Sequence, residues 1–233
     1  MKLAKLLIGL LLLPACFAAT IAFREKIVDL LLKQVLFLAG AGAYLFLLAV
    51  FQQPIRTYVF GHELTHVLWI WLFGGKVKKF KVSAAGGGVR ADRANFLIFL
   101  APYFFPVYTF AVVAAYLIAS ALGASPVVHQ VFSFVAGFTW TFHLTFTIYT
   151  LLQRQPDISV NGSVFSLPLI YLANVIVLSI LVIFISGGLF YESFFARLWE
   201  KTEQIYFYLW VQAPRWSEDL VRWCRFALAL DKS

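Results

Sequence analysis

Residues 61–66 place two histidines and a glutamate close together, in the order Gly-His-Glu-Leu-Thr-His. On a helix, His62 and His66 are four residues apart and share one face, so both imidazoles can reach one Zn²⁺ ion. Glu63 follows the first histidine and is placed to accept a proton from a metal-bound water. The chain has only four histidines, and roughly 0.002 matches to this HExxH pattern are expected by chance. We therefore predict that His62 and His66 bind a metal and that Glu63 is catalytic.

The motif lies inside an apolar stretch, residues 56–74. An ionised side chain at the centre of a bilayer costs about 2.5–3.5 kcal/mol on insertion scales. Glu63 therefore needs a compensating partner or a function. The alternative is a polar cluster that only holds helices together. The helix is expected to start after Pro54 and to stop at Gly74-Gly75.

The composition is that of a membrane protein. Of the 233 residues, 62% are hydrophobic and 13% are charged, and the mean hydropathy is +0.84. The net charge of +8 does not indicate nucleic-acid binding, because the basic residues cluster in short loops between apolar runs. We expect an all-α polytopic membrane protein with about six transmembrane helices, near residues 5–23, 34–52, 56–74, 95–119, 127–152 and 165–187.

Two domains are expected: a membrane-embedded domain over residues 1–190, with its core at about 55–175, and a tail over 191–233. The tail mixes aromatic and charged side chains as an amphipathic helix does at a membrane surface; a substrate-docking surface is the alternative. The first segment is expected to be an uncleaved helix, although Leu13-Pro14-Ala15-Cys16 faintly resembles a lipoprotein cleavage site.

The loop at residues 76–93 carries six basic residues and one Asp, which predicts a cytoplasmic location. Counting back over six spans then places residues 24–33 inside and the N-terminus outside. That result conflicts with Lys2 and Lys5, which favour an inner N-terminus.

A short β-hairpin is predicted after the motif helix. Residues 79–83 alternate with period two, Gly86-Gly87-Gly88 allows a turn, and residues 89–91 can return. We expect this hairpin to be re-entrant and to offer an edge to which an extended peptide adds as a strand. An ordinary Gly-rich loop is the alternative.

Together, the HExxH motif in an apolar helix and the following Gly-rich basic hairpin resemble the site-2 protease family of intramembrane metalloproteases. The resemblance is greatest to its compact bacterial branch without PDZ domains, and it covers about residues 55–175. It implies a multi-pass protein of the bacterial inner membrane. It also implies that Zn²⁺ is bound by His62, His66 and a later aspartate, that Glu63 activates water, and that the substrates are transmembrane or membrane-inserted proteins.

The third metal ligand is open between two residues. The family pattern has an Asp-Gly dipeptide, which this chain lacks, and its best counterpart is Asp157 in Gln155-Pro156-Asp157. By helical rise, His143 matches the depth of the motif in the membrane, whereas Asp157 requires a re-entrant loop. Asn174 is a further candidate, either as a donor to a substrate carbonyl or oxyanion or as a helix-packing amide.

The motif together with this resemblance predicts an intramembrane zinc metalloendopeptidase that works in the lipid bilayer. The alternative is a non-proteolytic metal-binding membrane protein, either a transporter or an inactive protease-like scaffold. A transporter needs further ligands along a path, and only two histidines remain outside the motif.

Overall fold

The computed structural model describes residues 2–51, 53–83, 86–153, 155–188 and 191–230. It is mostly helical and contains one small two-stranded sheet. In chain order the elements are α1 (Lys2–Lys26), α2 (Val28–Leu32), α3 (Val35–Val50), α4 (Ile55–Leu72), β1 (Val77–Ser83), β2 (Gly86–Ala91), α5 (Phe96–Leu100), the 3-10 helix η1 (Ala101–Tyr103), α6 (Val107–Ala121), α7 (Pro126–Leu151), α8 (Pro156–Asn161), α9 (Ser163–Ile185) and α10 (Tyr191–Leu230).

Three of the described helices are long and apolar enough to cross a membrane: α1, α7 and α9. A fourth span is possible if α5–η1 and α6 count together, although the chain bends by 78° between them. Pro106 precedes α6 at this bend and has no N–H to continue a helix. The chain thus has the helices of a membrane protein, but the expected count of about six spans is not confirmed. α3 has only 16 residues, and α4 is not among the candidate spans.

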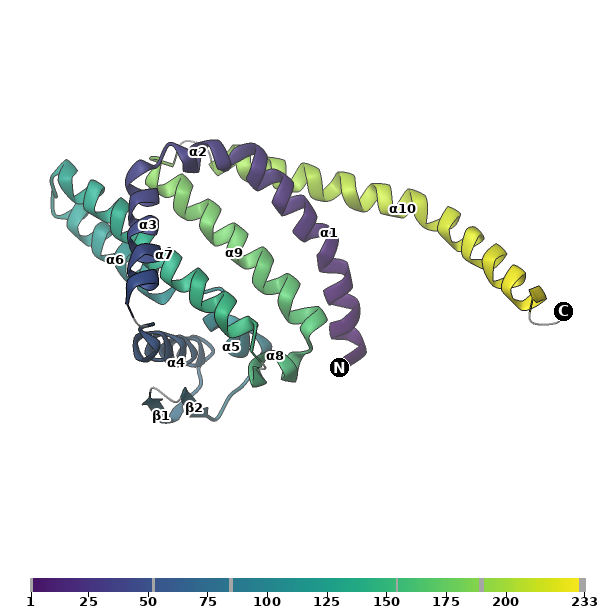
Figure 1. The fold of residues 1–233 in the computed structure, drawn as a ribbon, viewed down its shortest axis with the longest axis horizontal. Helices are drawn as coiled ribbons and strands as arrows, with labels where there is room; N and C mark the ends of the chain where they lie inside the picture. Colours follow the sequence, from purple (N-terminus) through teal and green to yellow (C-terminus); the bar gives the residue numbers. More distant parts are fainter. Residues whose placement is uncertain (1, 52, 84–85, 154, 189–190, 231–233) are drawn as a thin grey trace.

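The long helices form a bundle that runs between two ends of the molecule (Figure 1). α3 and α7 pack with their backbones in direct contact, because glycines lie at the crossing. A Cβ on Gly40 would lie 1.9 Å from the carbonyl oxygen of Phe134, and one on Gly137 would lie 1.9 Å from that of Phe37. Small residues allow this close approach between helices in an apolar environment.

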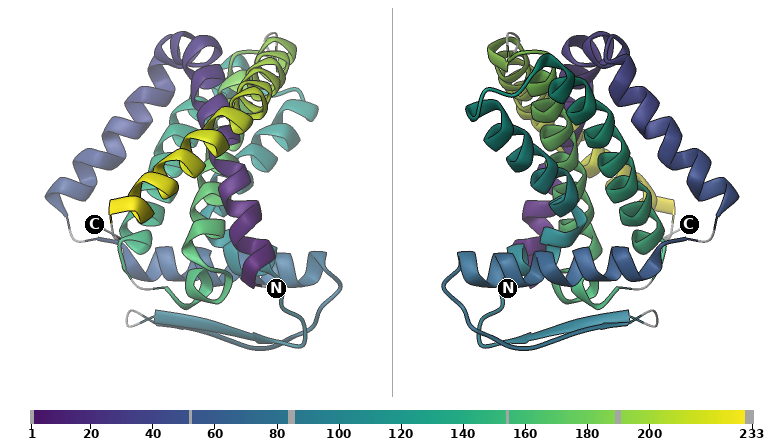
Figure 2. Two further views of the ribbon diagram at one scale, coloured as in Figure 1. Left: turned by 90° about the vertical axis from the view of Figure 1, so that its right-hand side faces the viewer. Right: turned by 90° about the vertical axis from the view of Figure 1, so that its left-hand side faces the viewer.

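α4 does not run along the bundle but lies across one end of it, and the hairpin lies beyond α4 (Figure 2). α4 begins after Pro54 and ends where expected, because Gly74 adopts a positive φ of 67° and the Gly75 N–H donates to the Ile70 carbonyl at 2.8 Å.

The placement of α4 changes the predicted topology. The start of α1 lies at the same end of the bundle as the hairpin, and residues 24–33 lie at the opposite end (Figures 1 and 2). The sequence count gave the reverse arrangement because it treated α4 as a span.

The predicted hairpin is present as antiparallel strands β1 and β2. It packs along α4 on the side away from the other helices (Figure 2). The expectation of a re-entrant hairpin is therefore not confirmed.

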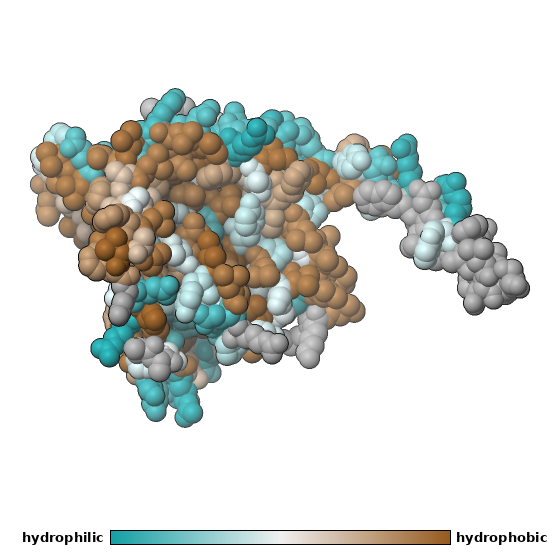
Figure 3. All heavy atoms as spheres, in the orientation of Figure 1, coloured by the Kyte–Doolittle hydropathy of each residue, from teal (hydrophilic) through white to brown (hydrophobic). Residues whose placement is uncertain are grey.

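Hydrophilic side chains gather at the two ends of the molecule, over the hairpin and along α2 and the start of α10, with apolar side chains between them (Figure 3). α10 packs its first turns against α1, where Phe194 is fully buried and Arg197 forms an ion pair with Glu25. The helix then extends away from the bundle (Figure 1).

Candidate metal centre

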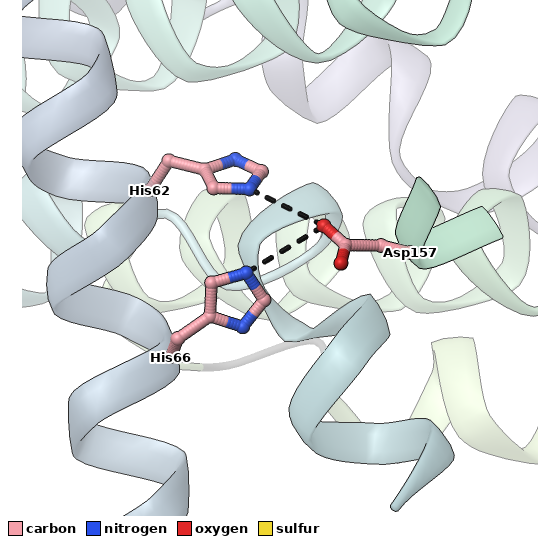
Figure 4. A group of neighbouring side chains, drawn as sticks. All are labelled: His62, His66 and Asp157. Atoms are coloured by element: carbon pink, nitrogen blue, oxygen red, sulfur yellow. Dashed lines mark ion pairs between the residues drawn. The ribbon is translucent and has the colours of Figure 1, made fainter. Parts of the chain in front are cut away.

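Two helices bring His62, His66 and Asp157 together. The two histidines project from one face of α4, and Asp157 lies in the first turn of α8, near the end of the bundle that α4 crosses (Figure 4). One ligand atom from each residue lies within 4.8 Å of the other two. The Asp157 Oδ2 atom is 3.6 Å from Nε2 of His62 and also 3.6 Å from Nε2 of His66. This is the one group of three or more His, Cys, Asp or Glu residues in the described chain that could hold a metal ion.

The spacing of these atoms fits a small tetrahedral ion. Metal–ligand distances of 2.0–2.2 Å at the tetrahedral angle separate two ligand atoms by about 3.3–3.5 Å. The two Nε2–Oδ2 distances exceed this by little, so a modest closing of the side chains brings the three atoms into a coordination sphere. Two neutral imidazoles and a carboxylate are a donor set that suits Zn²⁺ and leaves a fourth position open.

The other ring nitrogen of His66 is held by the backbone. Its Nδ1 lies 2.8 Å from the carbonyl oxygen of Ile98 in α5, so the proton belongs on Nδ1 and the Nε2 lone pair faces the site. α5 is fixed locally, because the Asn95 side chain caps it by accepting from the Ile98 N–H at 2.8 Å. The backbone of Ile98 thus contacts the capping side chain of Asn95 through its N–H and the candidate ligand His66 through its carbonyl.

His62 is oriented by a chain of hydroxyl groups. Its Nδ1 lies 3.1 Å from the Tyr58 hydroxyl, which lies 2.6 Å from the Thr150 hydroxyl. The Thr150 hydroxyl is the donor in this contact, and it also lies 2.6 Å from the Phe146 carbonyl. These contacts hold the His62 ring with its Nε2 atom on the side of Asp157.

Asp157 is held from two sides. The Tyr103 hydroxyl donates to Oδ2 at 3.3 Å, and the Asn161 amide donates to the Asp157 backbone carbonyl at 3.0 Å. Asn161 in turn accepts from the ammonium group of Lys5 at 2.7 Å. The first turns of α1 thus contribute to the position of the third candidate ligand.

Glu63 faces a cavity of about 730 Å³ that also exposes His62, His66 and Asp157. The β2 backbone covers the glutamate closely: a Cβ on Gly87 would lie 2.6 Å from Glu63 Cγ and 2.7 Å from its Oε1. A side chain at position 87 would require Glu63 or the strand to shift, which explains the glycine at this position.

The environment sets the charge of both carboxyl groups, which lie outside the candidate membrane spans. Burial is the main cause that raises the pKa of Glu63 to about 7. Burial also raises the pKa of Asp157, but hydrogen bonds and attraction from His62 and His66 outweigh it, so this pKa lies below its usual value. Asp157 is thus an anion suited to a ligand, and Glu63 has a basicity suited to proton transfer near neutral pH.

The other two candidate residues lie elsewhere. His143 is buried in α7 and lines a small cavity of about 20 Å³ beside His62, outside the three-residue group. The Asn174 amide donates to the carbonyls of Tyr103 at 2.9 Å and Ile170 at 2.8 Å. It does not line the large cavity, so its position is that of a packing amide rather than of an oxyanion donor. The depth argument that favoured His143 assumed that α4 spans the membrane, and α4 lies across the bundle instead (Figure 2).

Sequence reasoning missed the side chains that support the ligands. Tyr58 could have been found, because it lies one helical turn before His62. Asn161 could have been found in the same way, because it lies one helical turn after Asp157. Tyr103 and Lys5 carry no local signal, since their contacts span 54 and 156 residues along the chain.

Comparison of the chain with protein-family models, with curated proteins and with solved structures gives no match.

Proposed function

We propose that the protein is a zinc metalloendopeptidase of the membrane, as its resemblance to the site-2 proteases suggests. The observation that carries the proposal is the convergence of His62, His66 and Asp157 on one point beside Glu63, in a cavity of about 730 Å³. A cluster that only holds helices together has no need of an open cavity or of a basic carboxylate that faces it.

The roles of the side chains follow from their positions. Bound Zn²⁺ would supply a Lewis acid that acidifies water and polarises a carbonyl group. Glu63 accepts the proton of the attacking water at its carboxylate and delivers it to the amine that leaves. The Ile98 carbonyl keeps the His66 imidazole in the tautomer that a metal requires, and the Tyr58 hydroxyl holds the His62 ring in place.

The hairpin supports a peptide as substrate. Among the described residues the sheet has two strands, so β2 has an edge that no described strand pairs with, and the residues of β2 line the cavity. A peptide that adds to this edge is held extended, with its carbonyl groups freed from helical hydrogen bonds. The site lies at one end of a bundle of apolar helices (Figure 2), so we propose transmembrane or membrane-inserted proteins as substrates and the bacterial cytoplasmic membrane as the location.

The test pairs metal analysis with a cleavage assay on co-expressed single-span membrane proteins. Wild type should bind one Zn²⁺ per chain and cleave a substrate, and removal of the metal by a chelator should abolish cleavage. Glu63→Gln should retain zinc but lose cleavage, whereas His62→Ala should lose both. Full activity in Glu63→Gln would overturn the mechanism. Zinc binding without cleavage of any tested protein would favour a metal-binding scaffold or transporter.

A further inference from the structure

One face of the hairpin is turned toward α4. The Phe80 ring packs edge-on against Phe60 of α4, with centroids 6.2 Å apart. The Cβ direction of Gly87 points at Glu63 of α4. Strand alternation and the pairing of Phe80 with Val89 place all of these residues on the same, inward face.

The opposite face carries three exposed cations. Lys79 and Arg90 are directly paired across the two strands, and Lys81 pairs with Gly88, next to Arg90 on the same face. Like charges directly opposite each other destabilise a β-sheet. Within the described residues, no carboxylate forms an ion pair with any of these three cations. The hairpin therefore keeps a cationic face whose repulsion is not compensated by the rest of the chain.

The direction in which the cationic face points limits which kind of partner can reach it. The hairpin lies beyond α4 at the end of the bundle (Figure 2). Its cationic face is opposite the one that carries Phe80, and so it is turned away from α4. The apolar helices lie on the other side of α4 (Figure 2), so the cations point away from the part of the molecule that a bilayer would surround. An anionic partner must then approach from the aqueous side.

The free edge of β2 brings such a partner within reach. A peptide strand added there places every second side chain on the cationic face, beside Arg90 and Gly88. Gly88 has no side chain, and the space at its Cβ position is open to 4 Å. A carboxylate beside Gly88 can thus extend across it toward Lys81. The intervening side chains of the peptide face the cavity and Glu63.

We propose that this face selects substrates with acidic residues at alternate positions in the segment that pairs with β2. The inference rests on the proposed function, because it uses the same cavity and strand edge. Opposite charges across neighbouring strands stabilise the pair, so the acidic residues offset the repulsion between Lys79, Lys81 and Arg90. The hairpin thus contributes specificity for the substrate as well as the strand edge to which the substrate adds.

The experiment measures peptide binding rather than cleavage, with the Glu63→Gln protein in nanodiscs of neutral lipid. Two short fluorescent peptides of identical composition are compared by anisotropy. One has two Asp separated by a single residue, so both reach one face. The other has the two Asp adjacent, so they point to opposite faces. We expect the first peptide to bind about fivefold more tightly.

Variants connect this difference to the hairpin. Arg90→Gln and Lys81→Gln should each reduce the preference for the alternating peptide, and the double variant should abolish it. Lys26→Gln, an exposed cation at the opposite end of the bundle, should leave it unchanged. Equal binding of the two peptides to the parent protein would overturn the proposal. So would hairpin variants that weaken both peptides equally, since the cations would then attract anions without regard to face. Failure of both peptides to bind a protein that still holds Zn²⁺ would overturn docking at the β2 edge while leaving the metal centre intact.

Discussion

Asn161 connects the N-terminal helix to Asp157, so its replacement by alanine should weaken metal binding without touching a ligand. The change removes the bond from Lys5 at 2.7 Å and the bond to the Asp157 carbonyl at 3.0 Å. A hydrogen bond to a charged group contributes about 1.5–3 kcal/mol. If all of this were transmitted to the position of Asp157, the affinity would fall by about 12- to 160-fold. Because the Tyr103 hydroxyl still holds the carboxylate at 3.3 Å, we expect about a tenfold higher Kd for Zn²⁺.

The assay is competition for Zn²⁺ between the purified protein and a chromophoric chelator. Lys5→Met should give a similar loss, Lys5→Arg should restore most of the affinity, and the double variant Lys5→Met/Asn161→Ala should lose no more than Asn161→Ala alone. Lys26→Met, at the other end of α1, is the matched control and should bind as wild type does. An unchanged Kd in a folded Asn161→Ala protein would refute the coupling. Additive losses in the double variant would show that Lys5 acts by another route.

Two glycines give further predictions. Gly87→Ala places a Cβ 2.6 Å from Glu63 Cγ. The roughly 1 Å shift needed to relieve this contact should lower the proposed cleavage rate by about 100-fold, with little change in zinc affinity. An unaffected cleavage rate would contradict the close fit of β2 over Glu63. Gly9→Leu places a Cβ 2.2 Å from the Val164 carbonyl oxygen, so it should destabilise the fold by about 1–3 kcal/mol in thermal unfolding. Gly42→Leu is the control, because Gly42 lies in another apolar helix and the space at its Cβ is open. Equal stability of the two variants would argue against this packing of α1 on α9.

Local sequence patterns predicted the parts of the structure that depend on neighbouring residues. Helical spacing placed His62 and His66 on one face of α4, and Pro54 and Gly74 marked its ends. Alternation and glycine content predicted the hairpin. The number of membrane spans could not be predicted in the same way, because the hydropathy of residues 56–74 does not show whether the helix runs along the bundle or across its end.

The sequence by itself determined the two histidines, the neighbouring glutamate and the apolar character of the helices, since these follow from residue type and from repeats of two to four residues. Only the tertiary structure shows that Asp157, and not His143, lies in one group with His62 and His66. That grouping depends on how α4 crosses the end of the bundle and on how α8 is held near it by Tyr103 and Lys5. Such contacts join residues far apart in the chain, and their geometry is fixed by the packing of whole helices rather than by any local pattern.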